Sequence, residues 1–151
     1  MVSHGTFVIE RSFPQGPERV FAAFSDPAKK RKWFADSRSM ELEKYELDFR
    51  TGGSEVTSSR FKEGSPFPGV VMTNNSTYLD IVPNERIVLA YTMTIGENRI
   101  SASLATVELV ADGAGTKLKF TDQGAYFPGA DGPAMREHGW VKLLEALAKE
   151  C

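Results

Sequence analysis

The stretch that decides the fold is Arg86–Ile95, which reads RIVLAYTMTI. Every second residue falls on one strongly apolar face: Ile87, Leu89, Tyr91, Met93 and Ile95. The residues between them form the other face: Arg86, Val88, Ala90, Thr92 and Thr94. A period of two is typical of a β-strand. We therefore predict a strand here whose apolar face lies against the core.

Similar patterns on both sides of this stretch predict a series of strands. They cover residues 6–13, 40–49, 54–60, 74–82, 86–95, 100–111 and 116–123. Turn-forming residues separate most of them, at Thr51-Gly52-Gly53, Pro83-Asn84, Gly96-Glu97-Asn98 and 112–115. Residues 62–69, rich in Gly, Pro and Ser, read as an exposed loop, and a switch in alternation near Glu43-Lys44 indicates a β-bulge.

Helical patterns occur at two places. After the first strand, a helix begins at Pro17 and ends near Ser25, and a second short helix, capped by Asp26, closes on Trp33-Phe34. A long helix follows the last strand, from about residue 131 to residue 150, with Asp131 as its expected N-cap. Its predicted inner stripe consists of Arg136, Trp140, Leu143, Leu144 and Leu147.

This order of elements predicts the fold class. Strands grouped without helices between them favour an antiparallel sheet in an α+β domain. A six- or seven-stranded sheet is too wide for one helix to cover while flat, so we expect it to curve around the last helix and leave a concave space between them. Residues 1–151 are expected to form a single domain.

Composition narrows the function classes. The chain has 151 residues, a formal net charge of −2 and one cysteine, Cys151. The slight acidic excess argues against nucleic-acid binding, and no apolar run is long enough for a transmembrane helix. We expect no signal peptide, no disulfide within the chain, no metal site and no cofactor, and hence a cytoplasmic protein.

A set of short motifs resembles a known family, the homologues of the activator of heat-shock-protein-90 ATPase, within the START and birch-pollen-allergen-like helix-grip superfamily. The motifs occur in order along nearly the whole chain: Arg11, Val20-Phe21-x-x-Phe24-x-Asp26-Pro27, Trp33, Asp48-Phe49-Arg50-x-Gly52-Gly53, Pro83-x-x-Arg86-Ile87, Tyr91-Thr92, Gly115-Thr116-Lys117-Leu118 and Gly139-Trp140-x-x-Leu143-Leu144-x-x-Leu147. The resemblance implies a helix-grip fold. It also implies a range of functions, because superfamily members bind lipids, sterols, polyketides or hormones, some cyclise or dehydrate what they bind, and one activates a chaperone.

The sequence differs from the family pattern in two polar segments. Residues 54–59 read SEVTSS where larger aromatic or basic residues are usual, and residues 73–76 read TNNS. Both changes would widen or wet the cavity.

Several side chains are candidates for the cavity wall: Trp33, Phe34, Tyr91, Met93, Phe120, Trp140, Leu143 and Leu144. Taken one at a time, such residues usually belong to the core. Tyr91 is the most informative, because a buried phenol needs a hydrogen-bond partner. Gly139, inside the last helix, either allows close approach to the sheet or leaves room for a ligand.

Three residues are candidates for catalysis: Asp122, Tyr91 and His138. Asp122 continues the inward face of its strand, so it either emerges at the strand end or enters the cavity as an acid with a raised pKa. His138 fits a helix surface better. The basic run 29–32 reads as a solvated face, and Arg50 is expected to pair with a surface acid or to fix its turn.

Three hypotheses follow. The first is binding of a small, largely hydrophobic molecule in the cavity. The second is partnership with a heat-shock chaperone whose ATPase it modulates, and the third is a cyclase-like or dehydratase-like enzyme that uses the polar residues above. No nucleotide site is indicated, because the glycine pair joins two strands. An exposed sheet edge would allow two copies to pair as a homodimer.

Overall fold

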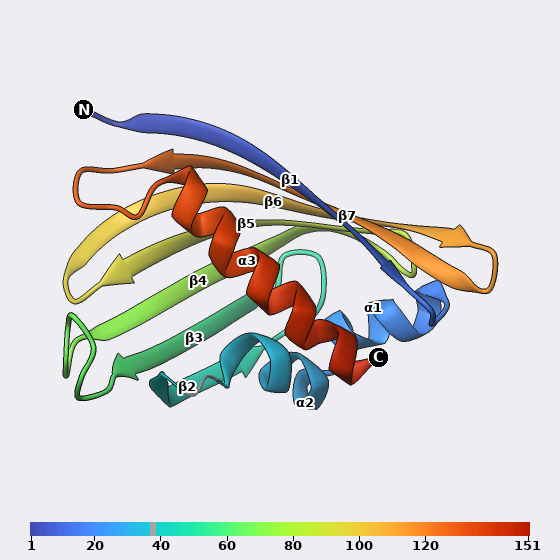
Figure 1. Ribbon diagram of the computed structural model, residues 1–151, viewed down its shortest axis with the longest axis horizontal. Helices are drawn as coiled ribbons and strands as arrows, with labels where there is room; N and C mark the ends of the chain where they lie inside the picture. The colour runs from blue at the N-terminus through green and yellow to red at the C-terminus, as the bar shows by residue number, and fades with distance from the viewer. Residues whose placement is uncertain (37–38) are drawn as a thin grey trace.

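Seven antiparallel strands form one curved sheet in the computed structural model, which describes residues 1–36 and 39–151. The strands lie in the order β1-β7-β6-β5-β4-β3-β2, so the first strand in the chain pairs with the last (Figure 1). Their bounds are β1 (Ser3–Phe13), β2 (Met40–Leu47), β3 (Ser54–Phe61), β4 (Val71–Val82), β5 (Arg86–Ile95), β6 (Asn98–Asp112) and β7 (Gly115–Tyr126). All seven predicted strands are present, and several extend further than predicted.

The helices lie on one face of this sheet. They are α1 (Pro17–Ser25), α2 (Pro27–Lys30), the π-helical segment η1 (Arg31–Ala35), α3 (Pro133–Leu147) and the short 3-10 segment η2 (Ala148–Glu150). Helix α3 runs diagonally across the curved sheet (Figure 1). The α+β helix-grip fold predicted from the sequence is thereby confirmed.

Irregular pairing helps the sheet to curve. The register shifts between Leu42 and Lys44 in β2, where the sequence predicts a bulge, and again between Tyr78 and Asp80 in β4. A third shift lies at Met93 and Thr94 of β5, where the extra residue is Ile100 of β6. Each bulge bends its strand and increases the local twist, which brings the inner face of the sheet around α3.

The core fills the space between the sheet and the helices at the end where α1 lies. Val20 and Phe24 of α1 are buried there, as are Leu144 and Leu147 near the end of α3. Aromatic rings join these elements, since Phe24 packs edge-on against Trp33 with ring centroids 5.1 Å apart. Burying each large side chain contributes about 1.5–3 kcal/mol, so this cluster holds the C-terminal half of α3 on the sheet.

The N-terminus of α3 differs from the prediction. The N-cap is Gly132, whose φ of 86° suits glycine, and not Asp131. The Asp131 carboxylate instead accepts two hydrogen bonds from the Arg136 guanidinium, each 2.9 Å long. Such a two-point pair between charged groups is stronger than a single cap to a backbone N–H, which explains the difference.

One residue of the basic run 29–32 differs from the prediction of a solvated face, whereas Arg31 and Lys32 are exposed as predicted. Lys30 is only 4% exposed, and its Nζ lies 3.0 Å from Oε1 of the buried Glu55 on β3. The rings of Phe24, Trp33 and Phe34 surround the ammonium group at 4.4–5.9 Å from their centroids. The hydroxyls of Tyr45 and Tyr78 also donate to Glu55. The pair therefore fastens the α2–η1 segment to the sheet.

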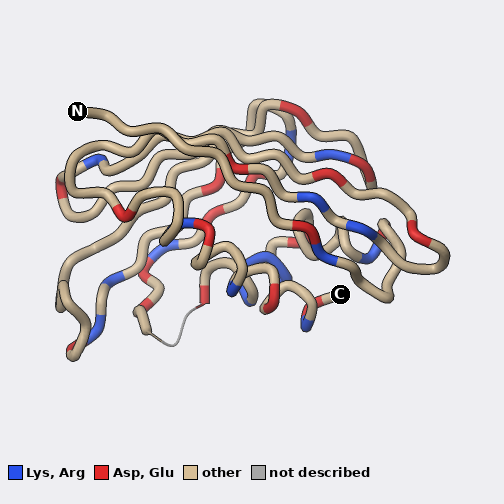
Figure 2. Tube along the Cα trace, turned by 45° about the horizontal axis from the view of Figure 1, so that its top comes forward, with Lys and Arg blue, Asp and Glu red and all other residues tan. Residues whose placement is uncertain are grey.

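Charged residues are otherwise spread over the molecule, with acidic and basic side chains interspersed along the chain (Figure 2). Arg50 pairs with Asp48 at the β2–β3 turn, as expected for a surface acid. Within residues 1–36 and 39–151, no helix is both long and apolar enough to cross a membrane.

The Lys30–Glu55 pair leads to a stability prediction. In Lys30→Met, the Glu55 carboxylate stays buried without its cation, which is expected to cost about 3–5 kcal/mol of unfolding free energy. The exposed Lys32 on the same segment provides the control, and Lys32→Met is expected to stay within about 0.5 kcal/mol of the wild type. Urea unfolding of both variants measures the difference. Equal stability would show that the pair does not hold the segment.

Candidate functional site

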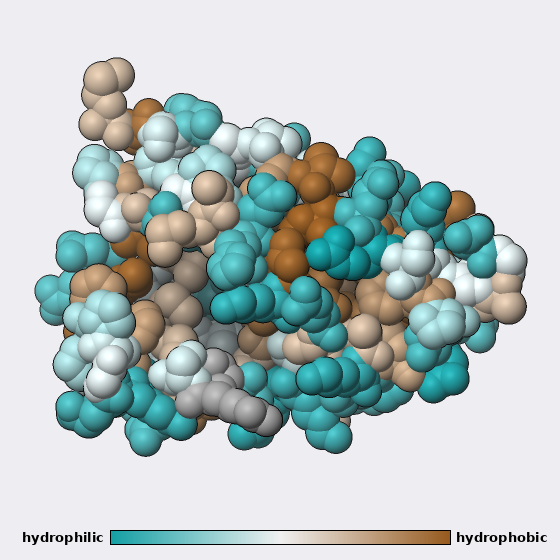
Figure 3. Space-filling view, in the orientation of Figure 1, coloured by the Kyte–Doolittle hydropathy of each residue, from teal (hydrophilic) through white to brown (hydrophobic). Residues whose placement is uncertain are grey.

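A cavity of about 320 Å³ lies between α3 and the inner faces of strands β3, β4 and β5. Its opening appears as a hollow beside α3 in the space-filling view (Figure 3). The described residues that line it are Phe34, Ala35, Met40, Thr57, Ser59, Met72, Asn74, Tyr91, Met93, Asp131, Met135, Arg136, Gly139, Trp140 and Leu143. Such a concave and largely apolar space is typical of small-molecule sites.

Methionine is prominent in the apolar part of the wall. The chain has five methionines, and four of them line the cavity: Met40, Met72, Met93 and Met135. Each comes from a different element, so they surround the space from several sides. Because methionine is unbranched and flexible, this wall can adapt to occupants of different shape.

Gly139 accounts for part of the open space. It lies within α3 and lines the cavity, and a Cβ atom built on it would meet nothing within 4 Å. Close packing of helix on sheet is therefore not the reason for a glycine here, and this corrects one of the two predicted explanations. The other explanation, room for a ligand, stays a hypothesis.

One wall of the cavity is polar but uncharged. Thr57 and Asn74 are paired across strands β3 and β4, and Ser59 lies two residues further along β3. All three come from the two polar segments in which the sequence differs from the family pattern. The Thr57 hydroxyl is buried, and it has no hydrogen-bond partner among the described residues.

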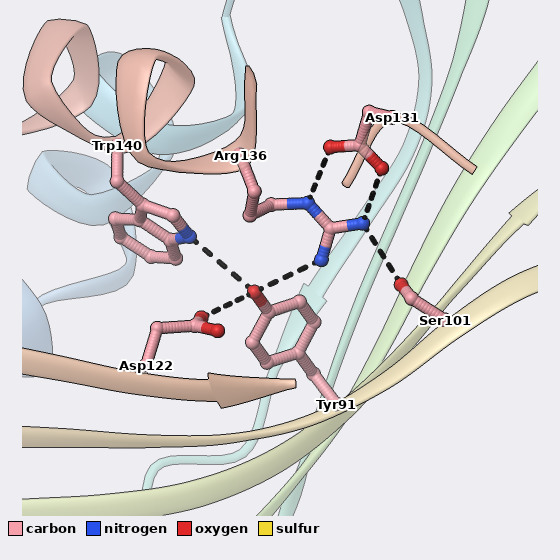
Figure 4. Close-up of polar contacts among 6 residues, drawn as sticks. All are labelled: Tyr91, Ser101, Asp122, Asp131, Arg136 and Trp140. Atoms are coloured by element: carbon pink, nitrogen blue, oxygen red, sulfur yellow. Dashed lines mark hydrogen bonds and ion pairs between the residues drawn. The ribbon is translucent and has the colours of Figure 1, made fainter. Parts of the chain in front are cut away.

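The end of the cavity near the start of α3 holds a buried polar network (Figure 4). The Tyr91 hydroxyl donates to Oδ2 of Asp122 at 2.6 Å and accepts from Nη1 of Arg136 at 3.2 Å and Nε1 of Trp140 at 3.4 Å. Nη2 of Arg136 also donates to the Ser101 hydroxyl at 2.9 Å. The network joins α3 to strands β5, β6 and β7.

Burial shifts the pKa values of the titratable groups in this network. Burial raises the pKa of Asp122 above its ordinary value, although the hydrogen bond from Tyr91 and the charge of Arg136 act in the opposite direction. Burial and the neighbouring Asp122 carboxylate raise the pKa of Tyr91 as well. Burial alone would lower the pKa of Arg136, but the hydrogen bonds and charge of its partners reverse this, so the guanidinium remains charged.

The structure brings most of the predicted cavity residues together. Phe34, Tyr91, Met93, Trp140 and Leu143 line the main cavity. Phe120 lines a smaller inner pocket together with Tyr91 and Trp140, and its ring lies 4.3 Å from that of Trp140.

The other predicted residues lie elsewhere. Trp33 packs in the core, where its Nε1 donates to the Ala23 carbonyl at 2.7 Å, and Leu144 is also a core residue. Among the catalytic candidates, Asp122 points inward and is fully buried, whereas His138 is exposed on α3.

Several residues of the site are not among the candidates identified from the sequence: Arg136, Asp131, the polar side chains of Thr57, Ser59 and Asn74, and the methionines Met40, Met72 and Met135. Arg136 stands on the predicted inner stripe of the helix, and an arginine between apolar stripe positions needs a buried partner. Asp131, five residues earlier, is that partner. Among residues 1–36 and 39–151, no group of three or more His, Cys, Asp or Glu side chains is arranged to hold a metal ion.

Comparison with known proteins finds similar sequences and structures. A family model described as "Activator of Hsp90 ATPase homolog 1-like protein" matches residues 15–151. The Mll3558 protein from Rhizobium loti is 48% identical, with a TM-score of 0.88 over 100% of this chain and 99% of that one. An uncharacterised protein from Rhizobium leguminosarum is 40% identical, with a TM-score of 0.90 over 98% and 94% of the two chains.

More distant structures share the fold. The AHSA1-like protein from Aeromonas hydrophila is 20% identical, with a TM-score of 0.70 over 97% of this chain and 91% of that one. A comparison with curated proteins finds no match.

The buried Asp122 leads to a prediction about pH. Because its pKa is higher in the folded than in the unfolded chain, the folded state holds its proton over a pH range in which the unfolded state has lost it. The contribution of Asp122 to stability therefore falls as pH rises above about 4, the ordinary pKa of aspartate, and levels off above the folded pKa. Asp122→Asn should remove this fall.

The measurement is urea unfolding of wild type and variant across this pH range. The stability of the wild type relative to Asp122→Asn is expected to decrease as pH rises. Asp112→Asn, at the exposed end of β6, is the control and should give a profile parallel to that of the wild type. A flat or rising difference for Asp122→Asn would contradict the assignment.

Proposed function

The chain belongs to the family of activator of Hsp90 ATPase homolog 1-like proteins, and from this premise we propose that it binds a small, largely hydrophobic molecule in the cavity between the sheet and α3. The observation that supports the proposal is the cavity itself. Its volume of about 320 Å³ lies at the lower end of the range of ~300–1,000 Å³ common for small-molecule sites.

The wall of the cavity has the composition that such a ligand would need. Apolar side chains from the helices and the sheet meet there, among them Phe34, Trp140 and Leu143. A protein interior is normally close-packed, so an open space of this size between helix and sheet is unusual for a purely structural region. We also propose a cytoplasmic location, on the basis of the composition.

The site favours binding over catalysis. A cyclase or dehydratase would need a group that exchanges protons with the ligand near neutral pH. The Tyr91 hydroxyl already has three hydrogen-bond partners and a raised pKa. Asp122 has a raised pKa, but it is fully buried and is not among the described residues that line the cavity, and His138 is exposed on α3. Modulation of a chaperone ATPase is suggested by the family description alone, whereas the cavity gives the binding function a physical basis.

Native mass spectrometry of freshly purified protein tests the proposal directly. A co-purified apolar molecule is expected, and binding of the uncharged dye N-phenylnaphthylamine gives an independent readout. If the protein carries no such molecule and the dye does not bind, the binding function is excluded for this cavity.

Gly139 provides a sharper test by mutation. In Gly139→Phe, the new ring extends into the open space and is expected to reduce dye affinity about tenfold or more, a loss of about 1.4 kcal/mol of binding free energy. Because phenylalanine is a better helix former than glycine, the unfolding free energy should stay the same or rise by a few tenths of a kcal/mol.

His138→Phe is the matched control, since it adds the same ring at the neighbouring exposed position of α3. It should leave dye affinity within about twofold of the wild type, because exposed substitutions change little outside their own contacts. Unchanged dye binding in Gly139→Phe would place the dye outside the cavity.

A further inference from the structure

The charges that line the cavity are already matched. Among the described lining residues only Arg136 and Asp131 carry a charge, and they form a two-point ion pair. Hydrogen bonds to Asp131, Ser101 and Tyr91 engage four of the five N–H donors of Arg136. The guanidinium therefore offers little charge to a ligand.

A second cation, in the smaller inner pocket, is also paired. Lys30 lines the smaller inner pocket, where it is held by the Glu55 carboxylate at 3.0 Å. A ligand carboxylate in the cavity would have to lose its hydration without gaining an unpaired cation, and it would lie near the Asp131 carboxylate. Burying such an uncompensated charge is strongly unfavourable.

The cavity does offer a neutral polar group. The Thr57 side chain lines the cavity, the residue is 9% exposed, and its hydroxyl has no partner among the described residues. A buried hydroxyl without a partner is costly. The Thr57 hydroxyl lies just under the cavity surface, and a rotation about χ1 would turn it toward the cavity, where a ligand oxygen supplies the partner. Ser59 and Asn74 extend this uncharged polar strip on the same wall.

We propose that the cavity selects uncharged apolar molecules that carry a hydroxyl or carbonyl oxygen, bound by the Thr57 hydroxyl, and rejects carboxylates. This inference rests on the proposed binding function and names the ligand class for the same site. The selection comes from two features together: an arginine neutralised within the protein, and a hydroxyl without a protein partner.

A matched pair of probes tests the charge rule. Methyl naphthoate and naphthoate share one ring system and differ in whether the carboxyl group is an ester or an anion. Calorimetric titration at neutral pH is expected to show the ester binding at least about tenfold more tightly. Equal or tighter binding of naphthoate would overturn the proposal.

Releasing Arg136 should reverse the preference. In Asp131→Asn the guanidinium loses its anionic partner, so naphthoate affinity is expected to rise about tenfold while ester affinity changes about twofold or less. A gain of binding cannot come from misfolding. If naphthoate affinity does not rise although thermal unfolding shows a folded variant, the matched charge is not what excludes the anion.

Thr57→Val tests the hydroxyl, because valine has nearly the same shape. We expect about five- to tenfold weaker binding of methyl naphthoate and no change for naphthalene, which has no oxygen. The urea midpoint should stay the same or increase, since Thr57 gives up no protein hydrogen bond. Unchanged ester affinity would overturn the role of Thr57. If neither naphthalene nor the ester binds the wild type, the proposed function itself fails, and this result differs from a failure of selectivity alone.

Discussion

The rest of the structure depends on the buried guanidinium of Arg136. It fastens the first turn of α3 to the sheet through Tyr91 and Ser101, and its charge is matched by Asp131 immediately before the helix. The other end of the helix is held by a different force, the apolar packing of Leu144 and Leu147. Because α3 is fixed at both ends by unrelated interactions, its middle needs only one large contact with the sheet, Trp140 on Phe120 of β7, and Gly139 leaves the space beside it open. The cavity lies beside that middle.

A second buried ion pair completes the enclosure. Lys30 and Glu55 hold the α2–η1 segment against β3, so that Phe34 forms one wall of the cavity and packs near Trp140, with ring centroids 5.9 Å apart. Removing either charge alone would leave its partner buried, and so both pairs fix a geometry even if they add little net stability. Two ion pairs, each without net charge, thus hold the elements on either side of the cavity. Because these pairs position the elements, the lining of the cavity can be largely apolar.

The sequence was sufficient for the fold because strand alternation and the helical stripe are local patterns that bulges hardly disturb. It was less informative about polar groups, whose placement depends on residues distant in the chain. Lys30 reads as one member of a basic surface run, and only its pairing with Glu55, 25 residues away, shows that it is buried. Asp122 likewise could have emerged at a strand end, and the partner that holds it inward, Tyr91, lies two strands away in the sheet. Sequence patterns identified part of the cavity wall, namely Phe34, Tyr91, Met93, Trp140 and Leu143, but pairing of charges determined its chemistry.

The cavity combines two kinds of lining with different tolerances. Its methionines can change rotamer at small cost, so the apolar wall sets only a loose limit on the shape of an occupant. The polar groups do not have this freedom, because Arg136 and Tyr91 are held by several hydrogen bonds each. Moving either group would leave buried donors and acceptors without partners, at a cost of about 1–3 kcal/mol for each one. A site built in this way accepts ligands of different shape but discriminates between charged and uncharged ones. Polarity, more than size, should therefore decide which molecules the protein holds.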